Sequence, residues 1–214
     1  MSRKFLLAGL GMLALVGLTL PLSAQQGWNG HRGWMSRVAQ NDTPSGPLTI
    51  AAAAARVREI LAASGYADLV PDEVMEFSNH FYVLVKEKST GIGAIEMIVE
   101  RNGFVHPEPG PNMMWNAKYG HMARGVMMGH GAAMIGSAGQ GQSLTTARAR
   151  EVATQYLAST FPGAEPDDGT AFYGYFTFDV ERNGKPFAML SVNAYTGGVW
   201  FHTWHGTFVQ EKHL

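Results

Sequence analysis

Hydrophobic and polar residues follow two different periods along the first half of the chain. Residues 49–64 combine an alanine run with one apolar helical face, and Gly65 ends this pattern. Residues 77–88 and 93–101 alternate apolar and polar positions on either side of a Ser-Thr-Gly turn, as strands of a hairpin do. The first half therefore predicts one helix followed by antiparallel strands.

The same order of elements returns after residue 142. Positions 149, 152, 153, 156 and 157 are apolar and share one helical face, and Phe161-Pro162-Gly163 ends the helix. Strands are expected over 172–181, 186–195 and 199–204. Asn183-Gly184 joins the first two strands, because this pair favours the positive φ of a tight hairpin.

Parts of the two halves also match residue by residue. Leu48-Thr49 matches Leu144-Thr145 at one offset, and Gly103-x-Val105 matches Gly197-x-Val199 at an offset two residues shorter. A three-stranded sheet with one apolar face needs a single amphipathic helix to cover it. We therefore expect an α+β fold of two tandem units, each with one helix packed on a three-stranded antiparallel sheet.

The second half resembles the PepSY domain family over roughly residues 143–204. The resemblance rests on the helix that ends in Phe161-Pro162-Gly163, the strand pair, and the closing turn Ala194-Tyr195-Thr196-Gly197-Gly198-Val199. The first half resembles a degenerate copy, with Gly65-Tyr66 in place of Pro-Gly and Arg101-Asn102-Gly103-Phe104 in place of the Thr-Gly turn. The resemblance implies two PepSY-like units without catalytic residues, in an exported protein that restrains or assists an envelope partner such as a peptidase.

The N-terminal residues have the pattern of an export signal. Arg3 and Lys4 precede the apolar run Phe5–Leu20, and Ser23-Ala24 suits cleavage. The alternative is an uncleaved anchor, but this run of 16 residues is at or below the length of about 17 to 25 that spans a bilayer. We expect a periplasmic or secreted protein that does not span the membrane after cleavage. The expected segments are a signal peptide (1–24), a flexible lead-in (25–46), a degenerate PepSY-like unit (47–106), a Met/His/Gly-rich connection (107–142), a PepSY-like unit (143–206) and a tail (207–214).

Composition excludes several classes of protein. Hydrophobic residues make up 46% and charged residues 15%, and there is no cysteine, which argues against a disordered polyelectrolyte, a disulfide scaffold and a thiolate metal site. With 16 basic and 17 acidic residues, the chain has no basic excess for a nucleic-acid partner. The sequence contains neither His-Glu-x-x-His nor Gly-x-Ser-x-Gly, so no enzyme is expected. Asp72, Glu73, Glu76 and Asp167-Asp168 are interpreted as solvated loop charges.

The connection between the halves holds half of the 12 methionines, interleaved with histidine. Thioether sulfur is a soft ligand and imidazole a borderline one, so the cluster suits copper as Cu(I). The alternatives are that the methionines fill the core or that they bind a partner together with Trp115. The candidate metal ligands are Met113, Met114, His121, Met122, Met127, Met128, His130 and Met134.

The last expected strand carries a second candidate site. Alternation over 199–204 places Trp200, His202 and Trp204 on one face, where aromatic side chains either bind a peptide or join the core. Together with Trp115, these residues are the candidate contacts to an envelope protein or peptide. The first functional hypothesis is thus a non-enzymatic, exported PepSY-like binding or regulatory protein. The alternative is a periplasmic copper-binding protein that uses the Met/His-rich connection.

Overall fold

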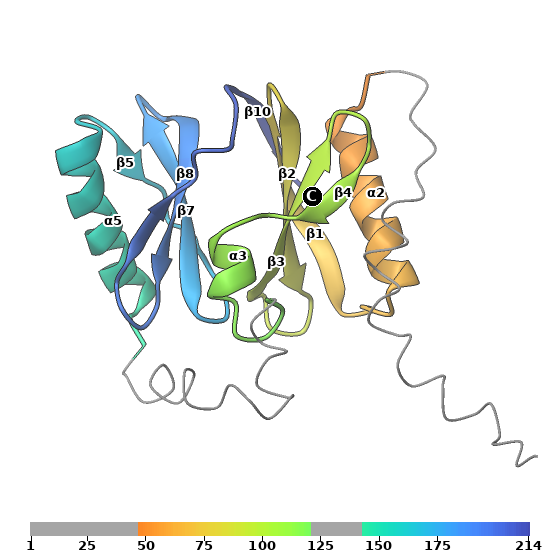
Figure 1. The fold of residues 1–214 in the computed structure, drawn as a ribbon, viewed down its shortest axis with the longest axis horizontal. Helices are drawn as coiled ribbons and strands as arrows, with labels where there is room; N and C mark the ends of the chain where they lie inside the picture. Colours follow the sequence, from red (N-terminus) through yellow and green to blue (C-terminus); the bar gives the residue numbers. More distant parts are fainter. Residues whose placement is uncertain (1–46, 121–142) are drawn as a thin grey trace, which may run out of the picture.

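The computed structural model describes residues 47–120 and 143–214, which form an α+β fold with two antiparallel sheets. The expected α+β class is therefore confirmed. Four layers follow one another in Figure 1: α5, the sheet of the second half (sheet B), the sheet of the first half (sheet A), and α2. The helices are α2 (Ile50–Ala63), α3 (Pro111–Met114) and α5 (Thr146–Thr160).

Each sheet has five strands rather than the expected three. Sheet A, in the spatial order β10-β1-β2-β3-β4, consists of β1 (Leu69–Phe77), β2 (His80–Glu87), β3 (Gly93–Glu100), β4 (Val105–Pro107) and β10 (Phe208–His213). Sheet B follows the order β5-β7-β8-β9, with β6 also paired to β7, and consists of β5 (Glu165–Pro166), β6 (Thr170–Ala171), β7 (Tyr175–Arg182), β8 (Lys185–Asn193) and β9 (Val199–Phe201).

Both long helices begin at a threonine cap. The backbone N–H of Ala52 donates to Thr49 Oγ1 and that of Arg148 donates to Thr145 Oγ1, each at 3.2 Å, which satisfies one free N–H group of each first turn. Their expected apolar faces are buried. The fully covered residues are Ala53, Ala54 and Val57 on α2 and Ala149, Ala153 and Leu157 on α5.

The central strands are buried on both faces. In β2, seven of the eight residues are buried, because α2 covers one face of sheet A and sheet B covers the other. The layer between the sheets contains Met75, Phe77, Tyr82, Leu84, Ile98, Phe172, Tyr175 and Met189. This middle layer joins the two halves into one core.

Two segments differ from the sequence-based expectations. Asp72, Glu73 and Glu76 belong to β1 instead of a loop, because β1 pairs with β2 on one side and β10 on the other. Residues 208–213 of the expected tail form β10 and complete the edge of sheet A. β10 was missed because its polar residues give it no apolar face of its own.

Several predictions fall on residues 1–46 and 121–142, which lie outside the described residues. They are the signal peptide, the lead-in and most of the Met/His-rich connection. Within the described ranges, no helix has the length and apolar character needed to cross a membrane.

Candidate functional site

A cluster of buried polar side chains interrupts the apolar layer between the sheets. Its members are His80 of β2, Glu96 of β3, Glu108 after β4, and His202 and His205 between β9 and β10. The side chains of Glu108, His202 and His205 are at most 2% exposed. Burying such groups is costly unless they are paired, so their gathering in one place marks a candidate site.

Backbone contacts fix Glu108 beside β3. Its N–H donates to the carbonyl of Glu96 at 2.8 Å. Asn112 of α3 strengthens this junction, because its Nδ2 donates to the carbonyls of both Glu96 and Glu108, at 3.0 and 3.2 Å. The short helix therefore holds the Glu108 side chain in the middle layer.

The two histidines are held by sheet contacts and ring stacking. His202 donates its backbone N–H to the carbonyl of Met189 at 2.9 Å, and its Nε2 lies 3.0 Å from Ser191 Oγ. The ring of His205 stacks on Phe77 with centroids 4.4 Å apart, and its Nδ1 lies 2.8 Å from His80 Nε2. Each ring therefore has one nitrogen engaged by a neighbour, and the other faces Glu108.

Three side chains converge on Glu108 Oε1. His205 Nε2 lies 3.0 Å away, His202 Nδ1 lies 3.5 Å away, and Trp204 Nε1 donates a hydrogen bond at 3.1 Å. The two imidazole contacts do not have hydrogen-bond geometry. Among the described residues, the buried atoms His202 Nδ1, His205 Nε2 and Glu108 Oε2 have no hydrogen-bond partner.

The electrostatics of the cluster favour an ionised Glu108. Burial alone would raise the pKa of its carboxyl, but the adjacent His202 and His205 outweigh burial and lower the pKa to about 2. Burial lowers the pKa of His205, and burial together with the charge of His205 lowers that of His80 to about 4. The Glu108 carboxylate therefore faces His205, an imidazole whose pKa is lowered by burial.

Glu96 is the second buried carboxyl of the cluster. Burial, reinforced by the charge of Glu108, raises the pKa of Glu96 to about 7. The hydroxyl of Tyr82 donates to Oε1 at 2.9 Å and that of Tyr175 to Oε2 at 2.7 Å. Because Tyr175 belongs to sheet B, this carboxyl connects the two sheets.

The arrangement suits metal binding better than hydrolysis. Ser191, His202 and Glu108 have the connectivity of a serine-histidine-acid triad, but Ser191 is fully buried and its hydroxyl also contacts Thr177 Oγ1 at 2.9 Å. A substrate therefore has no access to this serine. One carboxylate and two imidazole nitrogens, in contrast, are ligands that transition metals accept.

A second group of acidic side chains lies elsewhere between the sheets. Carboxylate oxygens of Glu73, Asp179 and Glu211 lie within 4.8 Å of one another. Burial raises the pKa of Glu73 to about 7 and raises that of Asp179 well above its usual range. Glu73 and Asp179 are therefore best described as carboxyls that retain their protons to a higher pH than usual.

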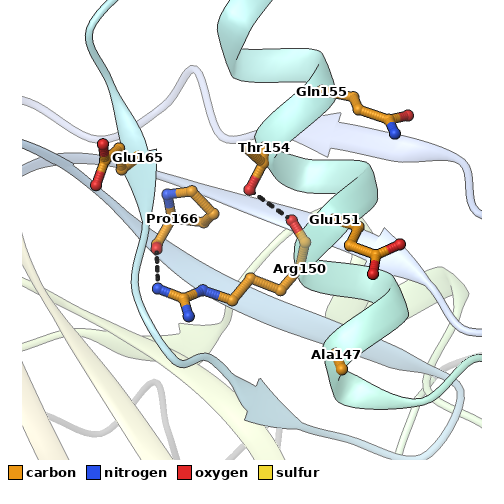
Figure 2. Close-up of a pocket in the computed structure, with 7 residues that line it drawn as sticks. All are labelled: Ala147, Arg150, Glu151, Thr154, Gln155, Glu165 and Pro166. Atoms are coloured by element: carbon orange, nitrogen blue, oxygen red, sulfur yellow. Dashed lines mark hydrogen bonds between the residues drawn. The ribbon is translucent and has the colours of Figure 1, made fainter.

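A pocket of about 580 Å³ lies between α5 and β5 (Figure 2). Two of its polar side chains are engaged by backbone carbonyls: Arg150 donates to the carbonyl of Pro166 at 3.1 Å, and Thr154 Oγ1 donates to the carbonyl of Arg150 at 2.9 Å. Glu151 pairs with Arg148 at 2.5 Å. The pocket therefore shows no arrangement of side chains typical of a catalytic site.

The structure brings the three candidate tryptophans together. Trp115 and Trp200 are in edge contact with ring centroids 5.7 Å apart, and Trp200 and Trp204 both lie against Gly110. All three are half-buried. His202 does not share their surface position: β9 ends at Phe201, and His202 points into the buried cluster. The His202 side chain is therefore not at the surface, and its contact to a partner stays a prediction.

The metal-ligand predictions lie mostly beyond what the structure describes. Met113 and Met114 belong to α3, where Met114 is 55% exposed. The others lie outside the described residues, namely His121, Met122, Met127, Met128, His130 and Met134.

Sequence reasoning missed His80, Glu96, Glu108 and His205 as members of one site. The His202-x-x-His205 spacing was the available signal, but nothing in the sequence linked it to Glu108. Comparison of the chain with protein-family models finds no match, and neither do comparisons with curated proteins and with solved structures.

Proposed function

We propose that the chain is an exported, non-enzymatic binding protein of two PepSY-like units that acts on an envelope protein or peptide, such as a peptidase. The observation that carries this proposal is the parallel construction of the two halves. A threonine-capped helix precedes antiparallel strands in both, and Thr49 and Thr145 occupy equivalent positions. The order of the strands supports the same view, because β1 has the interrupted pair β5 and β6 as its counterpart.

The closing turns support the comparison further. Gly103, before β4, and Gly197, before β9, both adopt positive φ, at +84° and +70°. Each turn leads into a short strand that pairs with the preceding long strand, β4 with β3 and β9 with β8. This agreement of helix cap, strand order and turn favours a duplicated unit.

Half-buried tryptophans give the partner a surface to bind. Trp115 of the connection and Trp200 of the second half are in contact, and Trp200 and Trp204 both lie against Gly110. Tryptophan is enriched among the residues that dominate binding energy at protein interfaces. The cluster Trp115, Trp200 and Trp204 is therefore the proposed contact surface, and it combines the connection with the second half.

Crosslinked affinity capture from envelope extract tests this proposal. We expect the wild-type protein to retain one defined envelope protein, and the variant Trp115→Ala/Trp200→Ala to bind that purified partner at least 10-fold more weakly. Phe104→Ala is the matched control, since Phe104 is 38% exposed and outside the tryptophan cluster. Equal retention by all three proteins, or no defined partner, would refute the proposal.

A second candidate function is soft-metal binding by the Met/His-rich connection. The exposed thioether of Met114, at the start of this connection, favours it. Titration with Cu(I) against a competing chelator should give weaker binding in the Met122→Leu/Met127→Leu/Met128→Leu variant. Identical affinity of the variant and the wild type would remove this candidate.

A further inference from the structure

We propose that Glu108, His202 and His205 bind one divalent transition-metal ion in the layer between the sheets. The starting point is the convergence of two buried imidazole nitrogens, His202 Nδ1 and His205 Nε2, on the carboxylate of Glu108. Both nitrogens, and the carboxylate oxygen Glu108 Oε2, lack a hydrogen-bond partner within the described part of the chain. Buried polar atoms are rarely left without a partner, and each such atom costs about 1–3 kcal/mol. A single cation held by the Glu108 carboxylate would engage both nitrogens.

The spacing of the ligand atoms fits a metal ion. Two ligands at about 2.1 Å from a tetrahedral ion lie about 3.4 Å apart. Glu108 Oε1 lies 3.0 Å from His205 Nε2 and 3.5 Å from His202 Nδ1, on either side of that value. The same distances would suit ion pairs between Glu108 and protonated imidazoles, but neither contact is aligned as a hydrogen bond.

Neighbouring side chains position each ligand. Ser191 engages the Nε2 of His202, and His80 engages the Nδ1 of His205, so each ring keeps one nitrogen for the ion. Histidines that bind metals commonly have the other ring nitrogen held in this way. Trp204 holds the carboxylate by donating to Glu108 Oε1. Ser191, His80 and Trp204 are thus positioning residues.

The ligand set defines the class of metal. One carboxylate and two imidazoles suit borderline divalent ions such as Zn²⁺ and Co²⁺, whereas Cu(I) prefers sulfur. This site therefore differs from the soft-metal candidate in the Met/His-rich connection. Metal binding at this site is also independent of partner binding by the tryptophan cluster, so the experiments can reject one proposal and leave the other standing.

The site connects segments that are distant in the sequence. Glu108 follows β4 of sheet A, and the two histidines lie on the segment that leads from β9 of sheet B to β10 of sheet A. Because the ligands are buried, the ion has a structural role: it fastens this segment, and with it β10, to the first half. Binding should therefore stabilise the folded state.

Metal titration of the purified, chelator-treated protein is the direct test. We expect one Co²⁺ per chain, with visible absorption typical of low coordination number, displaced by Zn²⁺. We also expect a rise in the thermal unfolding temperature on binding. His205→Asn and Glu108→Gln should weaken binding at least 100-fold, and Ser191→Ala about 10- to 100-fold. His106→Asn is the control, since His106 is a partly exposed histidine that pairs with Glu100 at 3.1 Å.

X-ray absorption spectroscopy of the wild-type protein with bound metal identifies the atoms that neighbour the ion. This measurement does not depend on variants that fail to fold. Nitrogen and oxygen neighbours with imidazole scattering are expected. Sulfur neighbours would overturn the proposal in favour of the Met/His-rich connection. Absence of stoichiometric binding to the wild-type protein, or full binding by both folded ligand variants, would also overturn it.

Discussion

Gly93 of β3 and Phe172 form a parallel β-bridge that joins sheet A to the segment before β7. A Cβ atom built on Gly93 would lie 2.6 Å from the Phe172 ring. Phe172 is 6% exposed and stacks on Tyr175 with centroids 4.6 Å apart, so the ring has little freedom to move. The absence of a side chain at Gly93 thus allows the two halves to approach each other.

Gly93→Ala should therefore destabilise the protein. The expected loss is about 1–3 kcal/mol in the free energy of unfolding, measured by urea denaturation, because the new methyl group overpacks the middle layer.

A double-mutant cycle with Phe172→Ala is the control for Gly93→Ala. Removing the ring makes room for the methyl group, so the double variant should be more stable than the sum of the two single losses predicts, by about 1–2 kcal/mol. Strict additivity would contradict direct contact as the cause.

The helices could be predicted closely because their signals are local. The cap residues Thr49 and Thr145, the apolar faces and the Gly65 stop all lie within each helix or next to it. β1 and β10 were missed because pairing with neighbouring strands stabilises them, and their own sequences lack a strand pattern. Glu73 and Glu76 break the apolar alternation of β1, and β10 is ordered by pairing with a strand more than a hundred residues earlier.

The buried cluster could be predicted only in part for a related reason. His202 stood out in the sequence as part of an aromatic strand, but its direction depends on β9 ending at Phe201. Glu108 stands in a proline-rich segment typical of a loop, and its backbone bond to Glu96, with the contacts of Asn112, brings it into the middle layer. Contacts that span the chain have no signature in a single sequence.

Tyr175→Phe should weaken the connection between the sheets. The change removes the donor to Glu96 Oε2 but keeps the ring, which is fully buried. At pH 8, above the raised pKa of Glu96, the expected loss is about 1–3 kcal/mol of unfolding free energy, because a buried carboxylate loses a partner. At pH 5, where Glu96 is neutral, the loss should be smaller. Tyr195→Phe, at a 39% exposed position, should change stability little at either pH.

Glu87 should make stability depend on acidic pH. Its buried carboxylate accepts hydrogen bonds from Lys118 at 2.5 Å, Tyr119 at 2.5 Å, Tyr173 at 2.7 Å and Thr90 at 2.8 Å. Burial alone would raise the pKa of Glu87, but these donors outweigh it and lower the pKa to about 2. A lowered pKa stabilises the folded state above the ordinary value of 4.5, and this stabilisation is lost as the pH falls towards 2.

Glu87→Gln tests this assignment by urea denaturation across pH. The variant should be about 1–3 kcal/mol less stable than wild type at pH 7, and the difference should shrink towards zero near pH 2. Glu151→Gln, at a surface carboxylate 60% exposed, is the matched control and should follow the wild-type curve. A constant difference between Glu87→Gln and wild type across pH would contradict the lowered pKa.

Glu73 and Asp179 should give stability the opposite pH dependence. Burial raises the pKa of Glu73 to about 7 and raises that of Asp179 well above its usual range. A raised carboxyl pKa means that the folded state binds protons more tightly than the unfolded chain. Stability should therefore decline as the pH rises from about 4 through 7, as these protons are lost.

Asp179→Asn should remove part of this decline, because the amide keeps the size of the side chain and carries no charge. We expect a gain of about 1–3 kcal/mol in unfolding free energy at pH 8 and little difference at pH 4. The control is Asp168→Asn, whose side chain is fully exposed and 3.5 Å from Arg150. A loss of stability at pH 8 in Asp179→Asn would mean that a cation, not protons, offsets the charges of this acidic group, because only a bound cation would make the carboxylate favourable there.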